Sequence, residues 1–311
     1  MGSGPILLCP TTYRNRCVSV KVSNQCLYCW PAAEPPGAGS TGADLLAEVH
    51  RVKASRTPLV ESAFMETQRF KECLAENYLR LRELAEGDLA AAVPSCPGWT
   101  MADLISHVAH VYLHKVETMR HNSSPDPWPP PPTGETEAQL LERGYRELQA
   151  EFSARPVSEP VFTWYAPDQT VGFWLRRMTH ETVVHRWDAE LAAEVPSKPI
   201  PGDLALDGID EALSIFVAWA CAQWPEDFAE ELAKGDGAVA VSAGSDRWLV
   251  SWDSSAVSAA ISDNAADAEV AGSPDAVLRW LWGRVDESAV VITGDPAKVA
   301  QLRGILRAGT Q

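Results

Sequence analysis

The sequence predicts an α+β protein in two folded parts: a four-helix bundle over residues 65–196, then a smaller α+β domain with an antiparallel sheet over residues 202–311. In the first part, apolar residues recur with the 3.6-residue period of an amphipathic helix; in the second, they alternate with polar residues, as in half-buried strands. Between the parts lies Val195 to Pro201, reading VPSKPIP, whose three prolines can continue neither a helix nor a central strand. This run predicts the domain boundary.

Residues 1–64 differ from the rest of the chain. They hold four of the seven cysteines and a run rich in Pro, Gly and Ser, from Pro31 to Gly42, and they sustain no helical or strand period. We interpret them as a disordered extension, or as the product of a start codon placed upstream of a true start near Met65. The alternative is a small zinc knuckle around Cys26 and Cys29, which form a C-x-x-C pair.

The composition excludes several classes of protein. The formal net charge is -16, whereas a nucleic-acid-binding protein needs a basic surface. No run of about 18 apolar residues exists, so no membrane span is expected. The opening apolar run is too short for a signal peptide, and the cysteines after residue 64 are scattered singly, as is typical of a reducing compartment. We therefore expect a cytoplasmic protein.

The first predicted helix starts at Met65 and ends near Gly87, and the second begins at Met101. Thr100 is a good N-cap for the second helix, and Asp103 suits its positive end. The first helix has one apolar stripe, which should face the core: Phe70, Leu74, Tyr78, Leu81 and Ala85.

The second helix carries a histidine, His107, on an otherwise apolar stripe. A polar group on a buried face needs a partner, which is either a backbone carbonyl or a ligand. His110 and His114 lie three and seven residues further along. The helix alone therefore leaves open which of the three histidines would be a ligand.

A proline-rich connector, residues 121–134, leads to a third helix. Thr136 and Gln139 form a capping-box pattern at its start. Four-helix bundles build metal sites from side chains on facing helices. The third helix buries one face: Leu141, Tyr145, Leu148 and Phe152.

The fourth helix, Thr170 to Glu190, places a carboxylate and an imidazole on one face. Glu181 and His185 are four residues apart, so both can bind one ion from a straight helix. His180 is five residues from His185, a rotation of about 140°, which excludes the H-E-x-x-H helix of zinc proteases. Asp188, one turn further, either orients a ligand or is a solvated helical Asp.

The C-terminal domain begins with a helix and continues with strands. Two N-cap-and-proline pairs, Ser273-Pro274 and Asp295-Pro296, predict two late helices around a short strand, Ala289 to Ile292. Arg284, at the end of the first of these helices, either binds a substrate carboxylate bidentately or complements the helix dipole. Period-two alternation predicts three antiparallel strands: near Val239 and Val241, Trp248 to Trp252, and Val257 to Ile261.

Two motifs carry a resemblance: CPGWT followed by His107, and DQTVGFW followed by HETVVHRWDAE. From Met65 to the C-terminus the chain resembles the mycothiol-dependent maleylpyruvate isomerase family, a branch of the DinB-like bundles with a sterol-carrier-like C-terminal domain. The resemblance implies a divalent metal, usually zinc, on His107, Glu181 and His185. It also implies that the open metal position activates the thiol of mycothiol, which adds to a cis-dienoic substrate and leaves as the trans isomer forms.

The predicted function is that of a zinc-dependent, mycothiol-using isomerase acting on a small electrophile. His107, Glu181 and His185 are its predicted metal ligands, and Arg284 is a candidate catalytic residue. Its partners would be a small-molecule substrate and a low-molecular-weight thiol, with no nucleic acid and no membrane. Two alternatives remain: a mycothiol S-transferase that detoxifies electrophiles, and a non-catalytic protein that uses the metal structurally or as a sensor.

Overall fold

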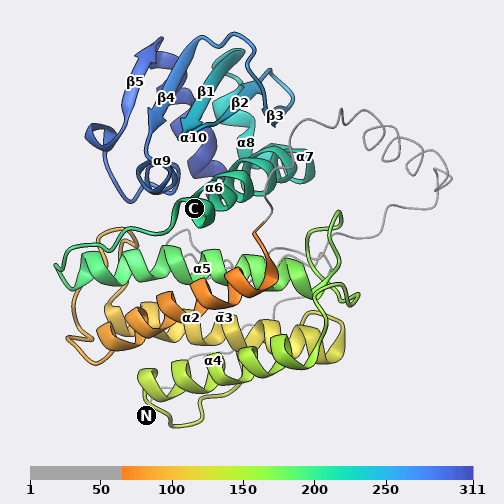
Figure 1. Cartoon of the computed structure of the whole chain (residues 1–311), viewed down its shortest axis with the longest axis vertical. Coiled ribbons are helices and arrows are strands. Elements are labelled where there is room, and N and C mark those ends of the chain that lie inside the picture. Colours follow the sequence, from red (N-terminus) through yellow and green to blue (C-terminus); the bar gives the residue numbers. More distant parts are fainter. Residues whose placement is uncertain (1–64, 311) are drawn as a thin grey trace, which may run out of the picture.

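The computed structural model describes residues 65–310. Both interpretations of residues 1–64, as an extension and as a zinc knuckle, lie outside the described residues. The first part of the described chain is a bundle of four helices, as the sequence predicts (Figure 1). These helices are α2 (Thr67–Leu84), α3 (Met101–His121), α4 (Glu137–Ala154) and α5 (Val171–Ala192).

The helix starts follow the predicted caps. The Asp103 backbone N–H donates to the Thr100 hydroxyl at 3.3 Å, and the Thr100 N–H donates to the Asp103 carboxylate at 2.8 Å. This capping box fixes the start of α3. Thr136 and Gln139 make the same reciprocal pair at the start of α4. The predicted apolar stripe of α2 is buried: Phe70, Leu74, Tyr78, Leu81 and Ala85.

Helix α5 is the bundle helix that faces the C-terminal region, residues 202–310 (Figure 1). It packs on α2 and α3, and Figure 1 shows it as the bundle helix nearest to α6. Almost all of its residues are buried, so its polar side chains must find partners inside the protein. Neither α5 nor any other helix within residues 65–310 is long and apolar enough to span a membrane.

The C-terminal region is a helical run followed by a sheet with helices beside it. The run holds the predicted buried residues Ile209, Leu213, Phe216 and Ala220, but its middle segment is π-helical. The helices are α6 (Gly202–Glu211), the π-helix η1 (Ala212–Trp219), α7 (Ala220–Gln223), α8 (Pro225–Leu232), α9 (Pro274–Leu281), the 3-10 helix η2 (Glu287–Ala289) and α10 (Pro296–Thr310). The strands are β1 (Gly237–Ala243), β2 (Asp246–Trp252), β3 (Val257–Ile261), β4 (Ala268–Gly272) and β5 (Val291–Gly294).

The five strands form one sheet in the order β3-β2-β1-β4-β5. The pairs β1–β2 and β2–β3 are antiparallel, as predicted. Strand β4 was not predicted; it pairs in parallel with β1 and antiparallel with β5. The α+β class is confirmed, and the sheet is mixed rather than wholly antiparallel. After β3 at one edge, the chain crosses to the far side of β1, where β4 runs in the same direction as β1. Alternation of apolar residues reports which face of a strand is buried, but it carries no information about this crossover.

The predicted strand Ala289 to Ile292 forms two residues later, as β5. The reason is local: Asp286 caps a short 3-10 turn by accepting a hydrogen bond from the Ser288 backbone N–H at 2.8 Å. That turn uses the residues before Val291, so they are unavailable for pairing with β4.

Charged side chains join the bundle to the C-terminal region. On α5, Arg176 donates to Asp207 at 2.8 Å and to Asp210 at 3.0 Å, both on α6. On α2, Arg69 donates to Asp203 at 2.9 Å. These pairs hold α6 against α2 and α5 and so join the C-terminal region to the bundle.

Candidate metal centre

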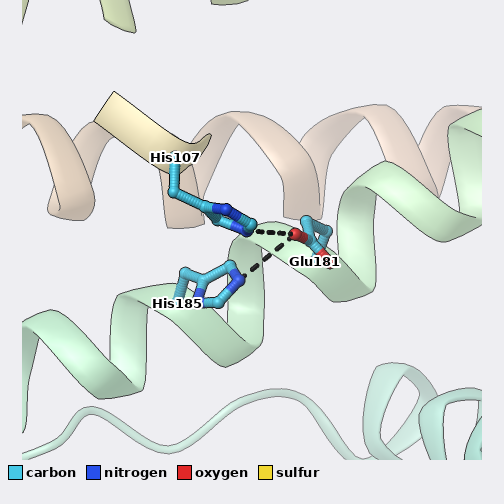
Figure 2. A group of neighbouring side chains, drawn as sticks. All are labelled: His107, Glu181 and His185. Atoms are coloured by element: carbon cyan, nitrogen blue, oxygen red, sulfur yellow. Dashed lines mark hydrogen bonds and ion pairs between the residues drawn. The ribbon is translucent and has the colours of Figure 1, made fainter. Parts of the chain in front are cut away.

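Three predicted ligands converge in the bundle. His107 comes from α3, and Glu181 and His185 come from α5 (Figure 2). His107 Nε2 lies 3.4 Å from Glu181 Oε1, and His185 Nε2 lies 3.2 Å from the same oxygen. One ligand atom from each residue can be chosen so that all three lie within 4.8 Å of one another. The arrangement has the size of a site for a single metal ion.

Local sequence places two of these side chains and tertiary packing places the third. Glu181 and His185 are one helical turn apart, so they project from the same face of α5. His107 lies on the buried stripe of α3, which packs on α5, and its ring centroid is 4.9 Å from that of His185. The three residues are nearly inaccessible, with 2–6% of their surface exposed.

The electrostatics of the cluster favour a cation between the side chains. Burial opposes a charge on His185, but Glu181 and Asp188 outweigh it and raise the pKa of His185 to about 9. Burial would raise the pKa of Glu181, yet the nearby charge of His185 and hydrogen bonds from both histidines hold it well below its usual value. Burial lowers the pKa of His107. The centre therefore keeps its carboxylate ionised beside one imidazole that stays neutral.

The orientation of His185 fits a metal ligand. Its Nδ1 lies 3.0 Å from Asp188 Oδ2, so the Nδ1–H donates to Asp188 and a metal ion would take the place of the proton on Nε2. That Nε2 is buried and lies 3.2 Å from Glu181 Oε1. A carboxylate–histidine pair of this kind fixes the tautomer that a divalent metal needs. Two imidazoles and one carboxylate are also a donor set that zinc accepts.

Asp188 is itself held by residues far away in the sequence. Arg284, just after α9, donates from Nε to Asp188 Oδ1 at 2.9 Å and from Nη2 to Oδ2 at 3.0 Å. Ser95 donates to Asp188 Oδ1 at 2.5 Å. Asp188 is fully buried, so the reading of it as a solvated helical residue is wrong and the reading of it as an orienting group agrees with the structure.

The structure places Arg284 differently from the expected substrate anchor. Its guanidinium is buried, forms the bidentate pair with Asp188, and donates from Nη1 to the Trp282 carbonyl. Asp188 outweighs the effect of burial and raises the pKa of Arg284. The bidentate carboxylate expected for this arginine therefore belongs to the protein itself.

Arg177 holds the second oxygen of Glu181 and was not predicted. Its Nη2 donates to Glu181 Oε2 at 2.8 Å, and its Nη1 pairs with Glu211 at the end of α6. Arg177 is four residues before Glu181 on α5, a spacing that could have indicated this pair. The partnership with Glu211 depends on how α6 docks and has no local signature.

The other histidines of α3 and α5 have separate partners. His110 bonds the Ser106 carbonyl at 2.8 Å, and the His114 ring packs edge-on against Trp128, with centroids 5.1 Å apart. His180 Nε2 lies 2.7 Å from Asp207 Oδ1 on α6. The structure therefore brings His107, and neither His110 nor His114, to the α5 pair, and His180 points away from it.

The loop before α3 contributes three contacts that the sequence reasoning missed. Ser95 and Cys96 contact Asp188, with Cys96 Sγ 3.7 Å from Oδ2, and the Trp99 ring lies 4.9 Å from the His107 ring. All three residues belong to the SCPGWT run. The run contains the CPGWT motif, which could have indicated that this loop lines the centre.

Comparison with known proteins identifies the family. The model described as mycothiol maleylpyruvate isomerase N-terminal domain matches residues 70–190, and the one described as MDMPI C-terminal domain matches residues 203–301. A crystal structure of a mycothiol-dependent maleylpyruvate isomerase is 15% identical, with a TM-score of 0.50 over 74% of this chain and 95% of that chain. A crystal structure of a histidine-to-alanine mutant of a mycothiol-dependent maleylpyruvate isomerase is 14% identical, with a TM-score of 0.49 over 74% of this chain and 95% of that chain.

At such low identity the structural likeness shows the fold only. No curated protein sequence matches the chain. The two family models, however, together match most of residues 65–310, including the positions of all three converging ligands. The chain belongs to the mycothiol-dependent maleylpyruvate isomerase family, a family of enzymes.

Proposed function

We propose that this protein is a metal-dependent isomerase, with zinc as the metal and mycothiol as the thiol cofactor, acting on a small electrophile of the maleylpyruvate type. The observation that carries the proposal is the convergence of His107, Glu181 and His185 in a chain of this family. Three protein ligands leave one metal position open, which is the pattern of catalytic rather than structural zinc sites. We also take residues 65–196 and 202–311 as its two domains.

In the proposed site, His107, Glu181 and His185 hold the metal. When bound, a zinc ion supplies Lewis acidity that lowers the pKa of a thiol at neutral pH without redox chemistry. Asp188 accepts the Nδ1–H of His185 and keeps its Nε2 lone pair available. Arg177 fixes Glu181 by bonding the oxygen that does not face the histidines.

We assign Arg284 a positioning role in place of the two roles that the sequence left open, which were binding a substrate carboxylate and complementing the helix dipole. It lies next to Asp188 and acts on the centre through the chain Arg284, Asp188, His185. A bidentate guanidinium restricts a carboxylate more than a point charge does. Through that chain, a residue of the C-terminal region orients a ligand of the bundle.

The proposed reaction returns the thiol unchanged. When bound, the thiol would supply a nucleophile that adds reversibly to the cis double bond, so that the bond could rotate before the thiol leaves and the trans isomer forms. His107, Glu181 and His185 would hold the metal that keeps this thiol ionised, and Asp188 and Arg177 would keep two of these ligands oriented. A cofactor that must stay a free thiol requires a reducing compartment, which supports a cytoplasmic location.

The test is metal analysis combined with cobalt substitution and turnover. We expect about one zinc per chain, a new thiolate-to-metal absorption band when mycothiol is added to the cobalt form, and isomerisation of maleylpyruvate that depends on mycothiol. Bound metal with no spectral response to the thiol would overturn the proposal in favour of a structural or sensory metal. A response without isomerisation would favour an S-transferase.

A further inference from the structure

The guanidinium of Arg177 lies between two regions of the molecule. On one side its Nη2 donates to Glu181 Oε2 at 2.8 Å, and on the other its Nη1 donates to Oε2 of Glu211, the last residue of α6. Arg177 is 3% exposed and Glu211 is 1% exposed. A buried guanidinium therefore bridges a proposed metal ligand of the bundle and a carboxylate of the C-terminal region.

Glu211 faces the arginine and not the site itself. Its second oxygen, Oε1, is buried and makes no hydrogen bond within residues 65–310. A buried carboxylate is costly unless a cation is paired with it, and Arg177 is the cation that Glu211 contacts. The small pocket beside Glu181 is lined by Arg177 but not by Glu211. We therefore expect Glu211 to affect the proposed centre through Arg177.

The π-helical segment η1 brings a second side chain to the same guanidinium. Glu211 lies immediately before η1, and Phe216 lies within it, five residues further on. In an α-helix two such residues would point about 140° apart, whereas the i→i+5 hydrogen bonding of a π-helix brings them nearly into line. The centroid of the Phe216 ring lies 5.0 Å from the guanidinium carbon of Arg177. The change of helix type therefore presents both a carboxylate and an aromatic ring to Arg177.

A third residue of the C-terminal region, Trp282, also lies near this arginine. Trp282 directly follows α9. Its ring centroid lies 6.0 Å from the guanidinium carbon of Arg177 and 5.3 Å from the centroid of the Phe216 ring. The carboxylate of Glu211 and the two packed rings together restrict how the guanidinium can turn.

The contact with Glu211 affects how Glu181 can bind a metal. Oε1 of Glu181 faces both histidines of the centre, and Oε2 accepts from Arg177. A guanidinium without a second partner could turn to take both oxygens of the carboxylate, which is its bidentate geometry, and its charge would compete with the metal for Glu181. Because Glu211 holds Nη1, Arg177 uses Nη2 on Glu181 and leaves Oε1 for the metal.

We propose that Glu211 is a positioning residue of the metal centre, which acts through Arg177 to keep Glu181 available through one oxygen and to balance the guanidinium charge. This inference rests on the proposed function, because it concerns the same centre. It gives the junction of α6 and η1 a role in metal affinity that is separate from holding α6 against the bundle.

The test measures zinc dissociation constants of the full chain by chelator competition. We expect Glu211→Gln to weaken zinc binding by about 10-fold, the lower end of the effect of outer partners, because it keeps the shape of Glu211 but removes the charge opposite Arg177. Glu211→Asp keeps the charge one carbon further away and should lose less, and it provides a second variant in case the glutamine variant is unstable. The cobalt form of Glu211→Gln should also show altered d–d absorption, because the coordination of Glu181 changes.

The matched control is Asp207→Asn. Asp207 also lies on α6 and pairs with the neighbouring arginine of α5, Arg176, at 2.8 Å. This variant weakens the same contact between helices, and it should match the parent in zinc affinity and in the absorption of its cobalt form.

A double-mutant cycle with Arg177→Met shows whether Glu211 acts through the arginine. Once Arg177 is replaced, Glu211→Gln should cause no further loss of zinc affinity. It should instead raise the melting temperature of that variant, because it removes a buried carboxylate that has lost its cation.

Equal zinc affinity in Glu211→Gln and the parent would overturn the inference. An equal loss in Asp207→Asn would also overturn it, since that pattern would come from docking alone, and so would a further loss of affinity in the double variant. A parent that binds no zinc would overturn both proposals. The expected Glu211 effects in a protein whose cobalt form does not respond to mycothiol would support this inference and contradict the proposed function, so the two failures are distinguishable.

Discussion

Two histidines of α5, five residues apart, are both buried beside an aspartate, but the second nitrogen of each ring faces a different neighbour. His180 and His185 are each 2% exposed, and each lies close to an aspartate oxygen, at 2.7 Å for Asp207 and 3.0 Å for Asp188. The free nitrogen of His185 faces Glu181. The free Nδ1 of His180 makes no hydrogen bond within residues 65–310 and instead lies against the backbone of α6.

The space around each ring explains the difference. A Cβ built onto Gly208 of α6 would lie 3.1 Å from His180 Nδ1, so the C-terminal region occupies the side of that ring where a ligand would have to bind. The corresponding side of His185 faces the Glu181 carboxylate and the His107 ring from α3. Burial and a carboxylate partner are therefore shared by His180 and by His185, a proposed metal ligand. Convergence with other ligand atoms is what separates them.

The largest expected effect comes from removing a proposed ligand. Alanine at His107, Glu181 or His185 should weaken zinc binding by more than the roughly 10- to 100-fold that outer partners contribute, because each removes a direct donor. His180→Ala is the matched control and should retain zinc. Chelator competition measures the dissociation constants. Equal loss in His180→Ala and His185→Ala would show that the comparison between the two histidines is wrong.

The next effect should separate the two aspartates. Asp188→Asn should weaken zinc binding by about 10- to 100-fold, because an amide replaces the carboxylate that fixes the His185 tautomer. Asp207→Asn alters the equivalent pair at His180 and should leave zinc affinity unchanged. Both variants are measured by the same competition assay, together with their melting temperatures. If both variants lost zinc affinity in proportion to their loss in melting temperature, the orienting role of Asp188 would be refuted.

The smallest effect on zinc affinity should come from Arg284, which acts one step further away. Arg284→Ala should weaken zinc binding by less than Asp188→Asn, while it destabilises the fold by about 3–5 kcal/mol, since it leaves Asp188 buried without its cation. Arg284→Lys should recover part of both effects. The measurements are zinc competition and urea unfolding. A raised KM for maleylpyruvate with unchanged zinc affinity and stability would restore the role of Arg284 as a substrate anchor.

Local sequence accounts for part of the site. The four-residue spacing of Glu181 and His185 and the five-residue offset of His180 follow from helix geometry alone. His107 could not be chosen over His110 and His114 in this way, because all three lie on α3 and the choice depends on how α3 rotates against α5. The choice of His107 came instead from the family resemblance in the CPGWT motif.

Contacts between residues far apart in the sequence could not be predicted, for a physical reason. Arg284 and Asp188 are 96 residues apart, and Arg177 and Glu211 are 34 apart. Each pair forms only when the C-terminal region docks on α5, and neither helix carries a local pattern for it. The parallel pairing of β1 with β4 is of the same kind. Periodicity predicted most of the elements and their buried faces, but it predicted neither β4 nor α8, nor these partners.

The Arg284 contact has a consequence for building chimaeras of this protein. Because a guanidinium from beyond α9 holds the aspartate that orients His185, the bundle carries all three proposed ligands but not everything that arranges them. A bundle fused to an unrelated C-terminal partner would keep every donor atom and lose that support. We expect transplants to succeed only when both parts move together, and cleavage of the linker between α5 and α6 to loosen the metal centre without touching any of its ligands.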